Sequence, residues 1–321
     1  MMIRQAHQFN EHHPELKGFS QYFFDEIAPI LYARENDRKK AIVKATQYSV
    51  LIAVVVVAFW VFSKWANFSK DAYLYSAMIG GGLIVGMFGW QFRSLESFTK
   101  EKIVGGICGY VGWKFVAVPR QPILEQWSSL MLIKKGYEAG KINNNRNVWV
   151  EDEISGEAHG AVFKSVEVRL TRSSGDDDVT DFGGQLMSIT FPREFTGRTV
   201  VLRNKGFLKG KKKGDMKRVG LVDPVFEKIF EAYGTDQVEA RYLLTPVFMQ
   251  TLVDLENSIN GKNTRFGFDK NQLFIAVETD DQYEAGSMFK PLIDPARTQK
   301  ILDEIGAVYD MVDIVSRAKR G

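Results

Sequence analysis

Three charged residues, Asp236, Glu239 and Arg241, have the types and spacing in this chain best suited to chemistry. Two carboxylates can act as a general acid and base, and an arginine can clamp an anionic group. The same residues have a structural interpretation, in which Asp236 holds a turn or caps a helix after Gly234, and Glu239 pairs with Arg241 on one face of an extended segment. We favour the structural interpretation, because structural ion pairs shift the pKa values of charged groups as active sites do, so a cluster of charges does not by itself indicate catalysis. We therefore predict no catalytic residue.

The strongest charge feature is a basic loop from Arg203 to Arg218. Eight basic side chains in it are offset only by Asp215, which leaves a net charge of +7. A loop exposed to water is the first interpretation, contact with anionic lipid the second and contact with nucleic acid the third, since Phe207 is the only aromatic residue there that could stack on bases. The candidates for contact with an anionic surface are Lys209, Lys211, Lys212, Lys213, Lys217 and Arg218.

Other groups of potential ligands have the wrong spacing for a metal site. The aspartates at 176–178 with Asp181 lack the alternating positions and central glycine of a calcium loop, so they indicate a polar hairpin turn. His7, His12 and His13 indicate a solvated tail. No phosphate loop or dinucleotide fingerprint is present. We predict no metal and no cofactor.

Two apolar stretches, Ala45–Ser63 and Ala72–Phe92, contain no Asp, Glu, Lys or Arg. Each is long enough to cross a hydrocarbon core about 30 Å thick at about 1.5 Å per helical residue. Only a short segment separates them. The sequence therefore predicts a transmembrane helical hairpin that contacts the lipid bilayer, with a pair of buried helices in a soluble protein as the less favoured alternative.

The basic residues around these stretches predict their orientation. The outer flanks are richer in lysine and arginine than the turn, and the positive-inside rule then predicts that both termini and the large C-terminal part lie in the cytoplasm. The unpaired Cys108 agrees with a reducing compartment. The outer flanks contribute Arg34, Arg38, Lys39, Lys40, Lys44, Arg93, Lys100 and Lys102, whereas the turn contributes Lys64 and Lys70.

Gly82, Gly86 and Gly89 share one face of the second predicted helix, because they lie at positions i, i+4 and i+7. Small residues at this spacing let helix backbones approach closely. We predict a helix-packing role for them. The first span of the same chain is the favoured neighbour, because it is tethered nearby, and a second copy in a homo-oligomer is the alternative.

Beyond the hairpin, the pattern predicts an α+β fold in which helices pack on an antiparallel sheet. Short β-branched segments with turn signals between them predict strands at 148–154, 161–170, 184–191 and 198–202, and a hairpin at 265–278. Asp-Pro or Thr-Pro pairs predict three helix starts, at 223, 245 and 294. The predicted division is a cytoplasmic segment 1–43, the hairpin 44–92, a juxtamembrane connector 93–121 and a cytoplasmic domain 122–321.

Several blocks of the C-terminal part resemble the bacterial domain of unknown function 3137 family. They include Glu151–Gly156, Phe195–Leu202, Leu221–Phe230 and Tyr233–Pro246, in the same order and without gaps. The resemblance covers about residues 149–313. It implies a membrane-anchored cytoplasmic domain with no established activity, and it points to a LemA-like membrane protein as a possible partner.

Three functions follow as hypotheses from these patterns. The leading one is a non-enzymatic inner-membrane protein whose cytoplasmic domain binds a protein partner or acts in envelope-associated assembly or regulation. The alternatives are a membrane-tethered enzyme that uses Asp236, Glu239 and Arg241, and a structural protein that self-assembles through the glycine face. Convergent carboxylates in a deep pocket would favour the enzyme, and an exposed apolar patch would favour the binding protein.

Overall fold

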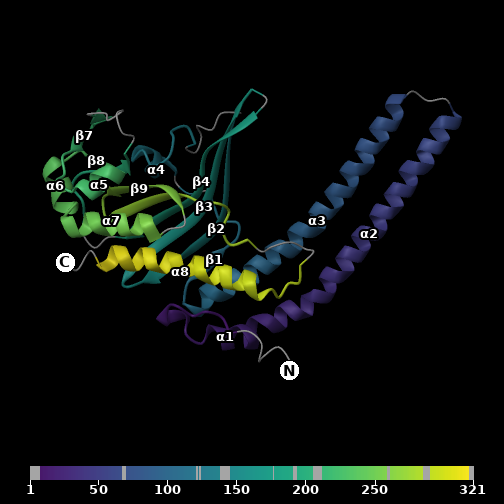
Figure 1. The fold of residues 1–321 in the computed structure, drawn as a ribbon, viewed down its shortest axis with the longest axis horizontal. Helices are drawn as coiled ribbons and strands as arrows, with labels where there is room; N and C mark the ends of the chain where they lie inside the picture. Colours follow the sequence, from purple (N-terminus) through teal and green to yellow (C-terminus); the bar gives the residue numbers. More distant parts are fainter. Residues whose placement is uncertain are drawn as a thin grey trace. The chain divides into compact units, whose positions relative to one another are not determined.

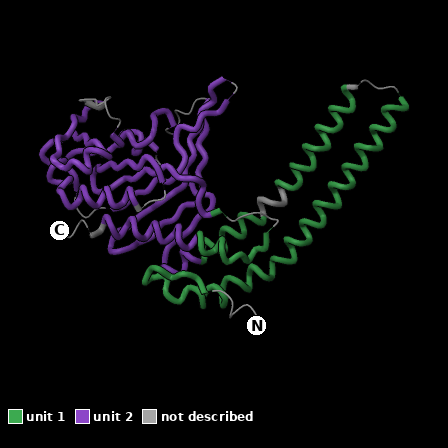
Figure 2. Tube along the Cα trace, in the orientation of Figure 1, with its two compact units in different colours: residues 1–106, 284–300 green, residues 107–283, 301–321 purple. Residues whose placement is uncertain are grey.

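The protein was analysed as a computed structural model, in which the chain divides into two compact units (Figure 2). The first unit comprises residues 1–106 and 284–300, and the second comprises 107–283 and 301–321. This division differs from the four predicted segments, because residues 284–300 group with the N-terminal helices. The structure describes residues 8–66, 70–120, 122, 124–137, 145–175, 177–190, 194–204, 212–258, 261–284 and 290–317.

The first unit is built on two long helices, α2 (Ala28–Trp65) and α3 (Lys70–Tyr110). Both are long and apolar enough over part of their length to cross a membrane. No proline interrupts either helix after Pro29, which lies in the first turn of α2. Helix α3 continues through Gly105 and Gly106 to Tyr110. A Cβ atom on Gly106 would lie 2.5 Å from the Ile27 side chain, so this glycine permits a close approach inside the unit.

Aromatic side chains form a small core before α2. The turn η1 (Pro14–Leu16), the helix α1 (Phe19–Tyr22) and the π-helical turn η2 (Phe23–Ile27) lead into it. The ring of Phe9 lies 5.7 Å from that of Phe19 and 5.0 Å from that of Phe23, centroid to centroid. Phe19, Phe23 and Ile27 are all buried, as expected of an apolar stripe at i, i+4 and i+8.

The second unit is organised around a ten-stranded sheet in the order β1-β2-β3-β4-β10-β9-β5-β8-β7-β6 (Figure 1). Every neighbouring pair is antiparallel, so the α+β prediction is confirmed. The strands are β1 (Lys114–Val116), β2 (Arg146–Ala158), β3 (Ala161–Ser174), β4 (Asp177–Thr190), β5 (Thr199–Arg203), β6 (Lys212–Lys213), β7 (Met216–Val219), β8 (Phe230–Gly234), β9 (Lys262–Asp269) and β10 (Gln272–Glu278).

Four helices and part of a fifth complete this unit: α4 (Leu124–Ser129), α5 (Pro224–Ile229), α6 (Gln237–Leu243), α7 (Pro246–Ser258) and the larger part of α8 (Pro295–Arg317). The three predicted proline starts are confirmed. Asp223 caps α5 by accepting hydrogen bonds from the backbone N–H groups of Val225 and Phe226, both at 2.9 Å. The buried core lies between the sheet and the covering segments, with Leu130, Leu132, Val166, Val168 and Phe274 among its members.

Two bulges interrupt the long strands. In β2, Asp152 and the next residue face a single residue of β3, because Glu151 pairs with Glu167 and Ile154 with Ser165. In β4, Asp181 is the extra residue, because Leu170 pairs with Phe182 and Thr171 with Thr180. Each bulge turns a carboxylate, that of Asp152 or Asp181, out of the regular alternation of the strand. Asp181 lines the cavity described below, and Asp152 acts electrostatically on the nearby Glu167.

Candidate functional site

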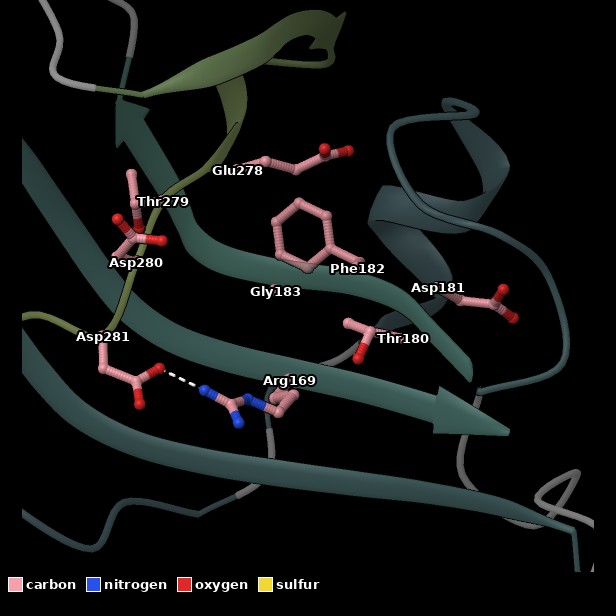
Figure 3. A pocket seen from close by; sticks show the side chains of 9 residues that line it. All are labelled: Arg169, Thr180, Asp181, Phe182, Gly183, Glu278, Thr279, Asp280 and Asp281. Carbon is pink, nitrogen blue, oxygen red and sulfur yellow. Dashed lines mark hydrogen bonds and ion pairs between the residues drawn. The ribbon is translucent and has the colours of Figure 1, made fainter. Parts of the chain in front are cut away.

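A polar cavity of about 610 Å³ opens on the second unit where β3, β4 and the end of β10 meet. Its floor includes Gly183, whose missing side chain leaves open space: a Cβ atom there would meet only a Thr180 methyl group, at 3.7 Å. Figure 3 shows the Arg169 guanidinium group directed at Asp281 across this space, whereas Asp181 points away from Asp281. The lining residues are Arg169, Thr180, Asp181, Phe182, Gly183, Glu278, Thr279, Asp280 and Asp281.

The bulge in β4 turns Asp181 toward the segment that follows α4. Its carboxylate accepts hydrogen bonds from Lys134 Nζ at 2.6 Å, Tyr137 Oη at 2.9 Å and Arg172 Nε at 3.2 Å. Burial raises the pKa of this carboxyl, but the three donors outweigh burial, and the net pKa is lowered. Asp181 is thus an anion held by its own protein, and it fastens residues 134–137 to the sheet.

A strap of residues 279–283 follows β10 and forms one wall of the cavity. Asp281 pairs with Arg169, and the Gln282 N–H donates to Glu167 Oε2 at 3.2 Å. Tyr283 ends the strap inside the protein, where its hydroxyl accepts a hydrogen bond from Gln185 Nε2 at 3.1 Å and its N–H donates to Glu304 at 2.8 Å. The strap is therefore held in place both at Asp281 and at Tyr283.

Glu167 lies beneath the strap and is only 7% exposed. Burial raises its pKa to about 8, the carboxylates of Asp152, Asp281 and Glu151 add to this increase, and the hydrogen bond from the Gln282 backbone opposes it. Asp152 is itself buried and has a positive φ of 54°, in the left-handed region. Three other carboxylates, those of Asp152, Asp281 and Glu151, are therefore near enough to act electrostatically on Glu167.

Three of the carboxylates that line the cavity, those of Asp181, Glu278 and Asp281, are already paired within the protein. Glu278 is already paired with Arg265, and Asp181 with its three donors. Burial raises the pKa of Cys108 to about 12, so this thiol is not a nucleophile at neutral pH. Within the described parts of the chain, no group of three or more His, Cys, Asp or Glu residues could hold a metal ion.

The residues proposed for chemistry have structural roles. Asp236 caps α6 by accepting from the N–H groups of Val238 and Glu239 at 2.8 and 3.0 Å. Glu239 is buried and accepts from the N–H groups of Thr196 and Gly197 at 2.8 and 2.5 Å, which fixes the segment before β5. The expected extended segment was wrong, because these residues form a helix. Glu239 and Arg241 are two positions apart on that helix and do not face each other.

The three glycines of the predicted packing face do not contact α2. A Cβ atom on Gly82, Gly86 or Gly89 would have nothing within 4 Å among the described residues, whereas one on Gly80 would lie 2.7 Å from Val56 Cγ2. Gly80 is therefore the glycine at which α2 and α3 approach most closely. Contact of the 82/86/89 face with a second copy stays a prediction.

The basic candidates are only partly described. Lys209 and Lys211 lie outside the described residues, as do the side chains of Lys212 and Lys213. Lys217 is exposed on β7, and a guanidinium nitrogen of Arg218 lies 3.7 Å from a carboxylate oxygen of Glu227. Contact of these residues with an anionic surface stays a prediction.

The sequence interpretation missed the cavity, although signals for it exist. Gly183 and Gly184 interrupt an alternating strand, and a glycine inside a strand often marks a bulge or a close approach. Asp280 and Asp281 follow a buried strand directly. Only the pairing of β4 with β3 and β10 brings these two signals together, and that pairing joins residues far apart in the sequence.

Comparisons with known proteins found a family match for one part of the chain. A search of curated proteins found no match. Among solved structures, the crystal structure of the mycobacterial trehalose monomycolate transport factor A, TtfA, is similar at 13% sequence identity and a TM-score of 0.31, covering 67% of this chain and 95% of that chain. This likeness is too distant to carry an argument. A family model described as a protein of unknown function (DUF3137) matches residues 180–317. The resemblance to this family is therefore confirmed for residues 180–317, the C-terminal part of the chain.

Proposed function

We propose that this chain is a non-enzymatic, membrane-anchored binding protein of the bacterial inner membrane. In this proposal α2 and α3 cross the bilayer and leave both termini in the cytoplasm. The second unit then binds a protein partner and acts in envelope-associated assembly or regulation. A LemA-like membrane protein is the partner class that the family resemblance suggests.

The observation that carries the proposal is a set of exposed apolar side chains on α5, α6, α7 and the loop before α5. These helices lie near one another at the end of the sheet that contains β7 and β8 (Figure 1). On α6, Val238 and Tyr242 lie one turn apart and are 63% and 72% exposed. The loop before α5 exposes Val222 at 97%. Val225 on α5 and Val247 on α7 are also exposed, at 55% and 67%, and these five side chains are here called the α5–α7 apolar surface.

Apolar side chains gathered on one part of a surface mark sites of protein interaction more often than sites of catalysis. An aromatic residue such as Tyr242 is also typical of the centre of an interface. The cavity over Gly183 is polar instead, and its carboxylates Asp181, Glu278 and Asp281 are held by cations of the same unit. The surface therefore favours a binding protein over an enzyme.

Site-specific photocrosslinking in living cells tests this proposal. A photoreactive amino acid at Tyr242 or Val238 of the full-length chain should give one discrete adduct, and the same amino acid at the exposed Lys262 on β9 should not. The double variant V238D/Y242D should lose an adduct formed through Val247, while its circular dichroism spectrum stays that of the parent. Adducts of equal yield at all positions, or none at the apolar ones, would contradict the proposal.

A further inference from the structure

The strand β2 has an outer edge that the second unit leaves open. Its partner on one side is β3 throughout, but β1 reaches only Glu153–Ser155 on the other side. In the described part of this unit, no strand pairs with the outer edge of residues 146–151, here called the β2 edge. Open edges of this kind are templates for a further strand.

The direction of the free backbone groups follows from two hydrogen bonds. The Ser173 N–H donates to the Asn145 carbonyl at 2.7 Å, so odd-numbered residues of β2 bond to β3. The Asp152 N–H donates outward to Ala117 at 3.2 Å, which fits the same alternation. Arg146, Val148 and Val150 therefore direct their N–H and C=O groups away from β3.

Both ends of the β2 edge are closed. The bulge at Asp152 and the bond to Ala117 stop pairing at one end. At the other end, the Arg146 guanidinium group donates to the Lys135 carbonyl at 2.8 Å and lies over the Tyr137 ring. Between these stops, the exposed face presents Trp149, which is 64% exposed. The length that remains fits a strand of about five residues.

We propose that the β2 edge of one copy pairs antiparallel with the β2 edge of a second copy, about a two-fold axis at Val148. An antiparallel pair of identical strands is self-complementary, so each outward N–H meets an outward C=O. Val148 then faces Val148, and Arg146 faces Val150. No like charges stand opposite each other in this register.

Polar complementarity selects the second copy as the occupant. In this register the exposed Glu151 of one copy faces Asn145 of the other, and the symmetry repeats that contact. An asparagine amide can donate a hydrogen bond to a carboxylate, which suits Glu151, the residue that pairs with Glu167 across the strands and precedes Asp152. Asn147 faces Trp149 across the same axis, so the exposed indole becomes covered. Every exposed side chain of the β2 edge thus gains a suitable neighbour.

Mixed disulfide formation tests the register in the full-length protein. Asn147 and Trp149 face each other as a pair without direct hydrogen bonds, for which Cα atoms lie about 4.5 Å apart, within the range of disulfides. Mixing N147C with W149C should give a mixed disulfide, whereas either variant alone should give little. The exposed Val162 on β3 supplies the control variant, V162C, which should not cross-link with either.

A proline variant tests the hydrogen bonds without breaking the sheet. Val148 directs its N–H outward, so V148P removes a bond to the second copy but none to β3. We expect the detergent-corrected mass to fall from twice 36.4 kDa to 36.4 kDa in V148P. V148T keeps both the N–H and the shape, and should remain dimeric.

A monomeric parent protein with unprotected amides at 146, 148 and 150 would overturn the proposal and leave the β2 edge to a strand of another protein. Equal disulfide yields in the mixture and in the separate variants would overturn the register. If V148P stays dimeric, the copies associate elsewhere, and the proposal fails.

Discussion

Glu167 shows how one residue links the sheet to the strap. Its buried carboxyl is within electrostatic range of three other carboxylates, and it accepts a hydrogen bond from a backbone N–H of the strap. Burial raises the pKa to about 8 from a value of 4.5. The folded protein therefore holds a proton on Glu167 that the unfolded chain releases, throughout the range between these two values.

The first prediction concerns the pH dependence of stability. The raised pKa means that the free energy of unfolding falls as pH rises from 4.5 to about 8, because the unfolded chain gains by ionising Glu167. The variant E167Q should lose this slope and exceed the parent at pH 8 by on the order of a few kcal/mol. Urea unfolding followed by tryptophan fluorescence between pH 5 and 9 measures both.

The control for this prediction is E153Q. Glu153 pairs with the exposed Lys164, and its substitution should leave the slope in place. If the parent and E167Q unfold with the same pH dependence, Glu167 does not carry the buried proton, and the strap is held by other contacts.

At the scale of elements, the sequence predicted those helices and turns that are determined by residues close together in the chain. The capped helices α5, α7 and α8 begin at their proline pairs, and the hairpin of β9 and β10 lies where its turn residues stand. Each of these signals lies within a few residues, so no distant part of the chain has to be known.

The elements that were missed depend on distant partners. The strand β8 (Phe230–Gly234) follows α5 without a turn residue, and its five residues are buried because β5 and β7 flank it. Likewise, β7 overlaps the end of the basic loop, where the many charged residues leave no alternation of apolar and polar residues that would indicate a strand. The first half of β4 is polar and exposed, so only its pairing with β3 identifies it as strand. Sequence periodicity cannot supply such pairings.

The second prediction concerns the contact between α2 and α3. A leucine at Gly80 would overlap the Val56 side chain, because even a Cβ atom lies 2.7 Å from it. We expect G80L to lower the thermal midpoint of the full-length protein in detergent and to weaken the hydrogen bond between Trp60 Nε1 and Ser76 Oγ, now 2.8 Å. Trp60 fluorescence and differential scanning calorimetry provide the measurements.

G82L is the matched control, since Gly82 faces open space in the described structure. It should unfold like the parent when the copies are dilute. A midpoint lowered equally by both substitutions would show that α2 contacts α3 through the predicted glycine face after all.

At the scale of the whole molecule, the absence of charged residues from two long stretches was the most informative feature of the sequence. Two charge-free stretches were sufficient to find α2 and α3, and among the described residues no further helix is long and apolar enough to cross a membrane. The extent of the first unit was not predictable, since residues 284–300 join it from the far end of the sequence. The candidate site could not be predicted for the same reason. Its walls come from β3, β4 and the strap, and each wall alone is an ordinary polar segment.

The last prediction concerns how the whole chain lies in the membrane. In the proposed arrangement, two spans leave the termini on one side of the membrane and the turn on the other, and the basic flanks favour the cytoplasm for the termini. A cysteine in place of Ala66, at the end of α2, should therefore react with a membrane-impermeant maleimide in intact spheroplasts. A cysteine in place of Val222, which is 97% exposed, should react only after lysis. The native Cys108 is buried and should not react in either variant.

Labelling of Val222→Cys in intact spheroplasts would place the second unit outside the cytoplasm. That result would remove the proposed cytoplasmic partner while leaving the pairing of β2 edges untouched.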